Sequence, residues 1–171
     1  SGCGLSSQET ISLEVKNIGN SDVQGGFTAS YQINGGAIIT NNLTDTIAAG
    51  LTKTIDFTTP ADLSVGTNVT DQTHSIKAWV NHSSDPYANN DSINTSIISG
   101  YQPATPIVQP TYTVNYGNTI TVTATSSDTL VWYESDTATT AVYTGKWFTT
   151  ATLYDTTMYY VSAISTQGLG C

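Results

Sequence analysis

Short segments in which apolar and polar residues alternate recur along the chain, and this alternation limits the folds that it can adopt. In residues 10–16 the side chains of Ile11, Leu13 and Val15 share one face, as in a half-buried β-strand. No long segment carries apolar residues at the spacing of an α-helix. The sequence therefore predicts an all-β protein.

A proline-rich segment at residues 101–110 separates two groups of such strands. It predicts a short linker between two tandem immunoglobulin-like β-sandwich domains, at residues 1–100 and 101–171. Asn34, Gly35 and Gly36 predict a hairpin turn, because these residues tolerate positive φ. Further strands of the first domain are expected at residues 27–33, 38–43, 51–57, 74–80 and 92–98.

The second group has the landmarks of an immunoglobulin-like core. Trp132 is expected to point inward, and residues 155–161 resemble the corner in which an Asp and a Tyr four residues later fix the chain. We therefore expect structural roles for Asp155 and Tyr159. Val161 stands where many such domains have a cysteine, which predicts a core held by apolar contacts.

Composition and residue spacing argue against several classes of function. A net charge of −9 with only four Lys and Arg residues disfavours binding to nucleic acid. No apolar run reaches the length of about 18 residues that a membrane-spanning helix needs. His74 and His82 have no ligand residues at metal spacing and are expected at solvated or strand-edge positions. No nucleophile motif is present, so we expect no enzyme and no cofactor. The pairing of Cys3 and Cys171 stays open.

The loop at residues 85–91 is rich in oxygen-bearing side chains. Such residues cap tight turns by bonding to their own backbone, which is the simpler interpretation. The alternative is a Ca²⁺ site, since this ion takes six to eight oxygen ligands. Its candidate ligands are Asp85, Asn89, Asn90 and Asp91.

Aromatic residues offer a second set of candidate contacts. In the strand at 74–80 the apolar face is Ile76, Ala78 and Val80, which places Trp79 on the opposite face. We expect a loop or a neighbouring domain to cover Trp79. The alternative is that Trp79 or Trp147 is exposed and makes a surface contact. Aromatic residues of the second part could instead form a flat row that stacks on sugar rings, or they are ordinary outward-facing strand residues. They are Tyr112, Tyr116, Tyr133, Tyr143, Trp147 and Tyr160.

Two family resemblances extend these predictions. Residues 1–19, with the Asn17-Ile-Gly19 turn, the hairpin at 34–36 and residues 47–50 and 89–91, resemble the bacterial CARDB family of cell-adhesion-related domains. Residues 132–133 and 158–163 are similar to immunoglobulin-like repeats of proteins exported by the type IX secretion system. Those repeats continue one strand past their terminal cysteine and bridge it to a cysteine near the position of Tyr116. The resemblance thus implies a second domain that lacks its last strand and its usual bridge.

Five segments with Asp, then Ser or Thr, resemble the acceptor consensus of a bacterial O-glycosylation system, although turn chemistry also explains them. The candidate acceptors are Thr46, Ser92, Thr129, Thr137 and Thr156.

The resemblances imply an extracellular protein, secreted or on the bacterial cell surface, that acts without catalysis in adhesion as a stalk or spacer. One alternative is a carbohydrate-binding accessory module of a secreted hydrolase. Another is a subunit of a surface filament that is completed by strand addition. The implied partners are neighbouring domains, another subunit, surface glycans or host proteins.

Overall fold

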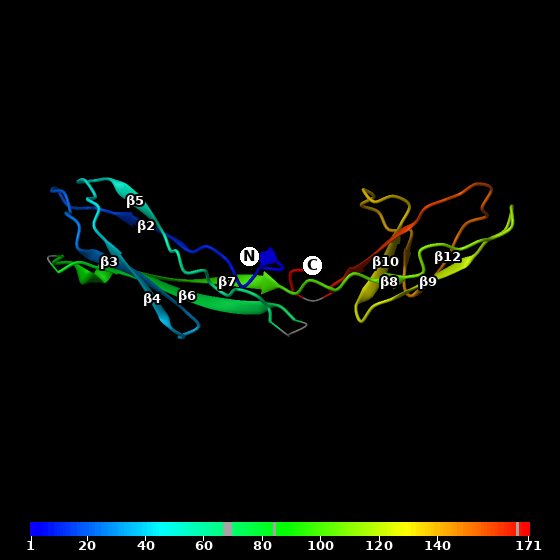
Figure 1. Cartoon of the computed structure of the whole chain (residues 1–171), viewed down its shortest axis with the longest axis horizontal. Helices are drawn as coiled ribbons and strands as arrows, with labels where there is room; N and C mark the ends of the chain where they lie inside the picture. Colours follow the sequence, from blue (N-terminus) through cyan, green and yellow to red (C-terminus); the bar gives the residue numbers. More distant parts are fainter. Residues whose placement is uncertain (67–69, 84, 167) are drawn as a thin grey trace. The chain divides into compact units, whose positions relative to one another are not determined.

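The computed structural model confirms an all-β fold of immunoglobulin-like β-sandwiches (Figure 1). It describes residues 1–66, 70–83, 85–166 and 168–171. The helical structure in these residues is one short 3₁₀ turn, η1 (Ala88–Asn90). The chain forms two compact units. The first comprises Ser1–Gly66 and Gln72–Ser99, and the second comprises Thr67–Asp71 and Gly100–Cys171.

The first unit consists of a five-stranded sheet, in the order β1-β7-β6-β3-β4, and a two-stranded sheet, β2-β5. β3 and β4 coincide with the strands expected at residues 27–33 and 38–43. Neighbouring strands pair antiparallel from β4 through β3 and β6 to β7, and β2 pairs antiparallel with β5. The strands are β1 (Gly2–Cys3), β2 (Ser12–Lys16), β3 (Phe27–Ile33), β4 (Ile38–Leu43), β5 (Thr52–Asp56), β6 (Gln72–Asn81) and β7 (Ser92–Gly100).

The turn between β3 and β4 forms as the sequence predicts. Asn34 and Gly35 have φ values of 51° and 71°, a left-handed conformation that Asn and Gly tolerate best. The amide of Gly36 donates to the carbonyl of Ile33 at 2.8 Å and closes the turn. This turn sets the register that pairs Gln32 with Ile38.

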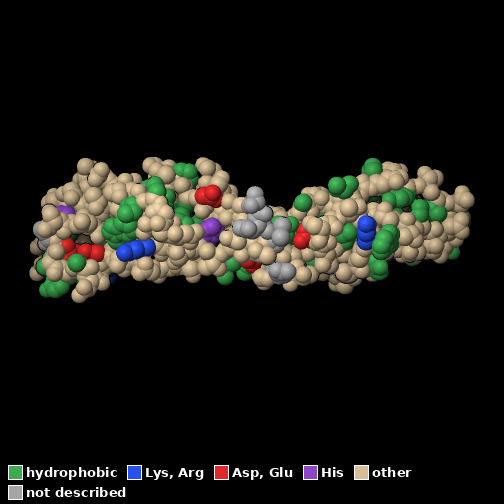
Figure 2. Space-filling view, turned by 90° about the horizontal axis from the view of Figure 1, so that it is seen from below, with side chains coloured by type: hydrophobic (Ala, Val, Ile, Leu, Met, Phe, Trp, Pro, Cys, Tyr) green, Lys and Arg blue, Asp and Glu red, His purple; other side chains and the backbone are tan. Residues whose placement is uncertain are grey.

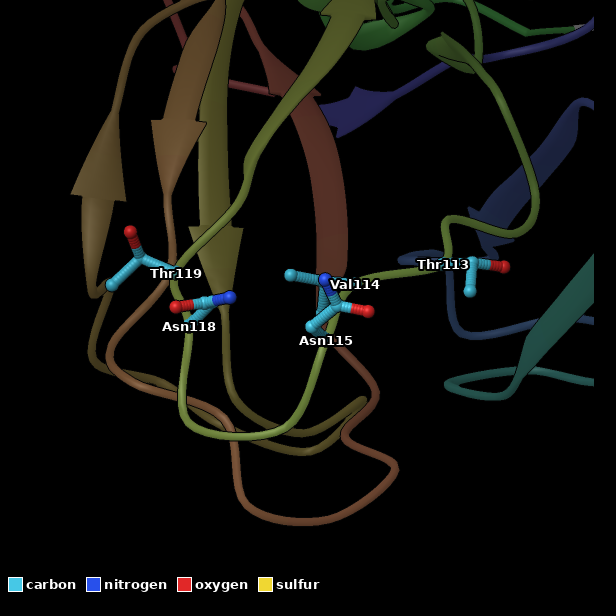
Figure 3. A pocket seen from close by; sticks show the side chains of 5 residues that line it. All are labelled: Thr113, Val114, Asn115, Asn118 and Thr119. Atoms are coloured by element: carbon cyan, nitrogen blue, oxygen red, sulfur yellow. The ribbon is translucent and has the colours of Figure 1, made fainter.

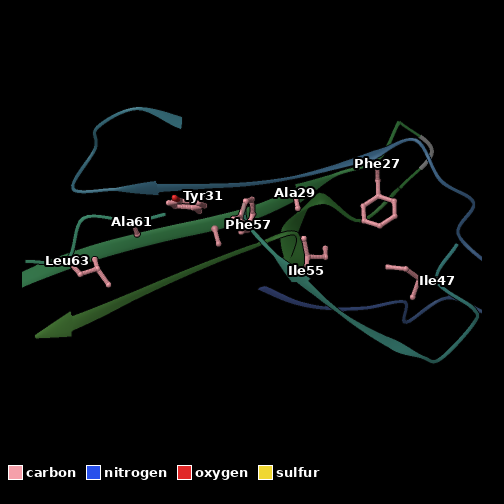
Figure 4. Close-up of a cluster of buried hydrophobic side chains, with 9 residues drawn as sticks. Phe27, Ala29, Tyr31, Ile47, Ile55, Phe57, Ala61 and Leu63 are labelled. Carbon is pink, nitrogen blue, oxygen red and sulfur yellow. The ribbon is translucent and has the colours of Figure 1, made fainter. Parts of the chain in front are cut away.

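The core of the first unit draws its buried side chains from both sheets (Figure 4). Phe27, Ala29 and Tyr31 alternate along β3 and point to the same side, as expected of a half-buried strand. The ring of Tyr31 lies edge-on to Phe57 at 4.7 Å, and its hydroxyl donates to the Thr59 carbonyl at 3.0 Å. The hydroxyl is thereby satisfied where its ring is buried.

The expected solvated or strand-edge position of His74 is wrong. β6 begins at Gln72, so residue 74 is a strand residue in phase with Ala78 on the inward face. His74 is 8% exposed, and its Nδ1 lies 3.2 Å from the side-chain nitrogen Nδ2 of Asn34. His82 is half-buried, with its ring edge-on to Phe27 at 6.5 Å.

The second unit contains two three-stranded sheets, in the orders β12-β9-β8 and β11-β10-β13. Ala124, Leu130, Trp132 and Phe148 form its buried core. The strands are β8 (Ile107–Val108), β9 (Thr121–Thr125), β10 (Thr129–Tyr133), β11 (Tyr143–Thr144), β12 (Trp147–Thr149) and β13 (Tyr160–Ile164).

β8 lies inside the segment expected to be a linker, so not all of residues 101–110 connects the units. Ile107 and Val108 pair with Thr125 and Ala124 of β9. Pro106 and Pro110 stand on either side of this strand, and proline is tolerated at sheet edges because no ladder bond is lost there. The proline-rich segment therefore supplies the outer strand of one sheet.

Gly25 is a point of close approach in the first unit, because a Cβ atom there would overlap the main chain of Thr44. We expect Gly25→Ala to lower the free energy of unfolding of this unit by about 1–3 kcal/mol, the usual cost of overpacking. Urea unfolding of the full chain followed by amide NMR measures the change. Gly2→Ala is the control, since its nearest neighbour is the flexible end of Leu5 at 3.2 Å. Equal stability of both variants would contradict the prediction.

Candidate functional site

The loop at residues 85–91 shows the turn chemistry that its composition favours. The Asp85 carboxylate accepts from the Tyr87 amide at 2.8 Å, and η1 follows. Burial raises the pKa of the Asp91 carboxyl, and the negative charge of Asp85 raises it further. Asn89 and Asn90 are exposed. Among the described residues, no three His, Cys, Asp or Glu side chains form a metal-binding group; Ca²⁺ binding by this loop stays a prediction.

Trp79 lies on the outer face of β6, as expected, and is half-buried. The Lys77 ammonium stands 5.5 Å from the centre of its ring, an arrangement that favours a cation over the aromatic face. Trp79 and residues of the 85–91 loop line the same open pocket, which has a volume of about 360 Å³. This pocket is lined by Lys77, Trp79, Val80, Asn81, Ala88, Asp91 and Ser92.

Trp132 occupies the centre of the second core. It is 4% exposed, packs against Phe148 at 5.4 Å, and donates from Nε1 to the Gly145 carbonyl at 2.8 Å. Val161 lies opposite Trp132 in the β10–β13 register. Both residues belong to the same apolar cluster.

The segment from Asp155 to Tyr159 is held differently from the expected corner. Asp155 is exposed, and within the described part of the chain its carboxylate makes no hydrogen bond. The Thr157 hydroxyl donates instead to the Asp155 main-chain oxygen at 3.2 Å. Tyr159 packs edge-on to Phe148 at 4.9 Å, so Tyr159 contributes through its ring.

The aromatic residues of the second unit do not form one flat row. Trp147 belongs to β12, whereas Tyr133, Tyr143 and Tyr160 belong to the other sheet. Trp147 is 61% exposed, with the Lys146 ammonium 5.6 Å from its ring centre. The continuous stacking platform considered from the sequence is therefore not assembled.

A different aromatic pair is brought together by the fold. Tyr116 lies 5.3 Å from Tyr154, ring centre to ring centre, and the rings meet at 68°. The pairing of Asn118 with Leu153 places them side by side. Sequence reasoning missed this pair, because no local pattern links two segments so far apart in the chain.

An open pocket of about 410 Å³ lies along the same loop as Tyr116. Figure 3 shows Asn118 and Thr119 on one arm of the loop and Val114 and Asn115 on the other. Thr113 completes the lining. Four of the five side chains are neutral and polar, and each of these four is exposed.

The candidate O-glycosylation acceptors differ in accessibility. Thr46, Ser92, Thr137 and Thr156 are exposed. Thr129 is half-buried at the start of β10, where it pairs with Ile164. An enzyme that modifies the folded chain would therefore reach the first four more readily.

Both cysteines, Cys3 and Cys171, are disulfide-bonded.

Asp71 links the last residues of the second unit to residues near its start. Its carboxylate accepts from the amides of Tyr101 at 2.9 Å and Leu169 at 2.6 Å. These charge-assisted bonds fix the chain close to Cys171.

Comparison with known proteins bears on the second unit. Residues 103–171 match the family model described as "Ig-like domain CHU_C associated". This match supports the bacterial immunoglobulin-like repeat expected there and agrees with the two-sheet fold of β8 to β13. No curated protein and no solved structure matched the chain. The CARDB resemblance of residues 1–100 stays a prediction.

The described residues include no helix that is long and apolar enough to cross a membrane.

Proposed function

We propose that this chain is a non-enzymatic extracellular module of a bacterial surface protein that acts in adhesion, as a stalk or spacer. The match of residues 103–171 to the immunoglobulin-like family carries the proposal, because domains of this family are generally non-catalytic. The CARDB resemblance of the first unit supports the adhesive role.

The physical character of both units suits such a role. Antiparallel ladders and separate apolar cores give each unit a fixed shape without a ligand. The net charge of −9 favours solubility. On the face drawn in Figure 2, Lys side chains are few within each unit and form no continuous basic surface there.

Attachment of cells of the native host to a solid support under flow tests this function. We compare the unaltered strain with one that lacks this chain, and with one that carries two unrelated β-sandwiches of equal length in its place. A spacer predicts reduced attachment after deletion and recovery with the replacement. An adhesive contact predicts reduction in both altered strains. Attachment equal to that of the unaltered strain after deletion would contradict the proposal.

O-glycosylation of the exposed acceptors is part of the proposal. Peptides that contain these acceptors, prepared from the native host, should exceed the masses given by their sequences by whole glycan increments. Thr137→Ala should remove one increment if Thr137 is an acceptor, whereas Thr139→Ala, a nearby exposed residue outside the motif, should remove none. An unmodified mass from native material would exclude glycosylation.

One observation favours a second function, assembly by strand addition. In the described part of the chain β13 pairs with β10 alone, and all five of its residues are half-buried. An outer strand of this kind presents main-chain N–H and C=O groups that another strand can bond. We expect a second copy or a neighbouring segment of the parent protein to bind at this edge.

Sedimentation of the purified chain over a range of concentrations tests strand addition. The proposal predicts association that grows with concentration and weakens in Ser162→Lys, because charge on an edge strand opposes pairing. An unchanged unfolding transition in the variant serves as the control for its fold. A monomer at every concentration, also after addition of the parent segment that follows, would contradict it.

A further inference from the structure

The loop at residues 113–119 is anchored along its Asn118 arm, and the Asn118 amide donates to the Asn115 carbonyl of the other arm at 3.2 Å. The Gly117 amide donates to the Leu153 carbonyl at 2.8 Å, and the Leu153 amide donates to the Asn118 carbonyl at 2.9 Å. One step further on, the amide of Thr150 donates to the Ile120 carbonyl at 2.9 Å. Thr150 is itself buried. The loop therefore continues the β9–β12 ladder, so its pocket is largely formed before any ligand arrives.

The pocket has the chemistry of a site for hydroxyl groups. Thr113, Asn115, Asn118 and Thr119 carry hydroxyl and amide groups that both donate and accept hydrogen bonds. No ionisable side chain lines the pocket. Its volume of about 410 Å³ lies within the range of roughly 300–1,000 Å³ that is usual for small-ligand sites. A neutral, polyhydroxylated ligand suits this lining.

Two exposed tyrosines belong to this loop and to the segment that pairs with it, because Tyr116 is a loop residue and Tyr154 follows Leu153, the partner of Asn118. Tyr116 is 80% exposed and Tyr154 is 59% exposed, although large aromatic rings are usually covered in folded proteins. Their edge-to-face contact holds both rings in place. A rigid tyrosine offers an apolar face for the C–H surface of a sugar ring and a hydroxyl at its rim.

The other exposed indoles are less suitable for a neutral ligand. The ammonium of Lys77 stands over Trp79, and that of Lys146 stands over Trp147. Each cation competes for the ring face on which a sugar would stack. The Trp79 pocket also contains Asp91, whose charge a neutral sugar does not balance.

We propose that the pocket of the 113–119 loop, together with Tyr116 and Tyr154, binds a neutral glycan. The Asn and Thr side chains bond to the hydroxyl groups of the sugar, and the tyrosine pair stacks on its apolar face. Anionic glycans bind less well, because the pocket offers no cation and the chain carries a net charge of −9. This site goes beyond the proposed function, since a stalk or spacer needs no ligand.

Titration of the ¹⁵N-labelled full chain, followed by amide NMR, tests the site. The neutral probes are cellohexaose, laminarihexaose and mannohexaose, and hexagalacturonic acid is the anionic probe of equal length. We expect at least one neutral probe to shift the amides of residues 113–119 and 153–154, and hexagalacturonic acid to leave them unchanged.

Substitutions then assign the binding to the tyrosine pair. Tyr116→Ala and Tyr154→Ala should each weaken binding about tenfold, as removal of an aromatic anchor does, whereas Tyr116→Phe keeps the ring and most of the affinity. Tyr87→Ala is the matched control, because Tyr87 is a 70% exposed tyrosine of the first unit. Three results would overturn the site: no shift with any neutral probe, shifts confined to residues around Trp79 or Trp147, or equal binding of the anionic probe. The purified chain is used throughout, so this test does not depend on the cell-surface proposal.

Discussion

Trp132→Ala should unfold most of the second unit while the first unit stays folded. The substitution empties the centre of the second core and removes the contact with Phe148 at 5.4 Å. Large-to-small changes of buried aromatic residues cost about 3–5 kcal/mol. A single hydrophobic core in a unit of this size rarely supplies more than about 3–5 kcal/mol, so little stability is left. Amide NMR of the full chain shows the loss as collapse of the signals of residues 103–166.

Trp132→Phe separates packing from hydrogen bonding. It keeps an aromatic ring beside Phe148 but loses the bond from Nε1 to the Gly145 carbonyl. The cost should be smaller than that of alanine, with about 1–3 kcal/mol from the unsatisfied carbonyl. A well-folded Trp132→Ala variant with native signals throughout the second unit would contradict the role given to this core.

Asn17→Ala should destabilise the first unit by about 2–4 kcal/mol, the sum expected from three hydrogen bonds at a partly buried site. The side chain is 7% exposed. Its amide nitrogen donates to the carbonyls of Ser21 and Ile47, each at 2.9 Å, and its oxygen accepts from the Gly19 amide at 2.9 Å. Asn17 thus joins the end of β2 to the chain before β5. The measurement is urea unfolding, monitored by the amide signals of residues 10–57.

Asn20→Ala provides the matched control in the same turn. Asn20 is exposed, and its side chain accepts only a long bond of 3.5 Å from the Ser21 hydroxyl. Its loss should change stability by less than about 0.5 kcal/mol, as at most surface positions. Equal effects of the two substitutions would show that the bonds of Asn17 do not stabilise the unit.

Much of the first unit could be predicted because its strands are half-buried. Alternation reports directly which face is inward, as with Ile11, Leu13 and Val15, which pack against the core. Asn34 and Gly35 specified their turn through backbone conformation alone. The position of His74 was predicted wrongly because the start of β6 could not be located to within two residues. Gln72 and Thr73, the first residues of this strand, are polar and show no strand pattern.

Features that depend on tertiary pairing were not predictable from the sequence. β8 was hidden because Ile107 and Val108 are a short pair between prolines, too few to show alternation. Asn17 was recognised only as a turn residue, since its partner Ile47 is distant in the chain and is brought close by folding. The Tyr116–Tyr154 pair depends likewise on the bridge between Asn118 and Leu153.

Location on the native cell tests the central claim most directly. Antibodies against the purified chain are applied to intact and to permeabilised cells of the native host, with a cytoplasmic protein as the marker of leakage. An extracellular surface module predicts labelling of intact cells, or chain in the medium if it is shed, with the marker silent. Labelling that appears only after permeabilisation, with no chain in the medium, would contradict the account.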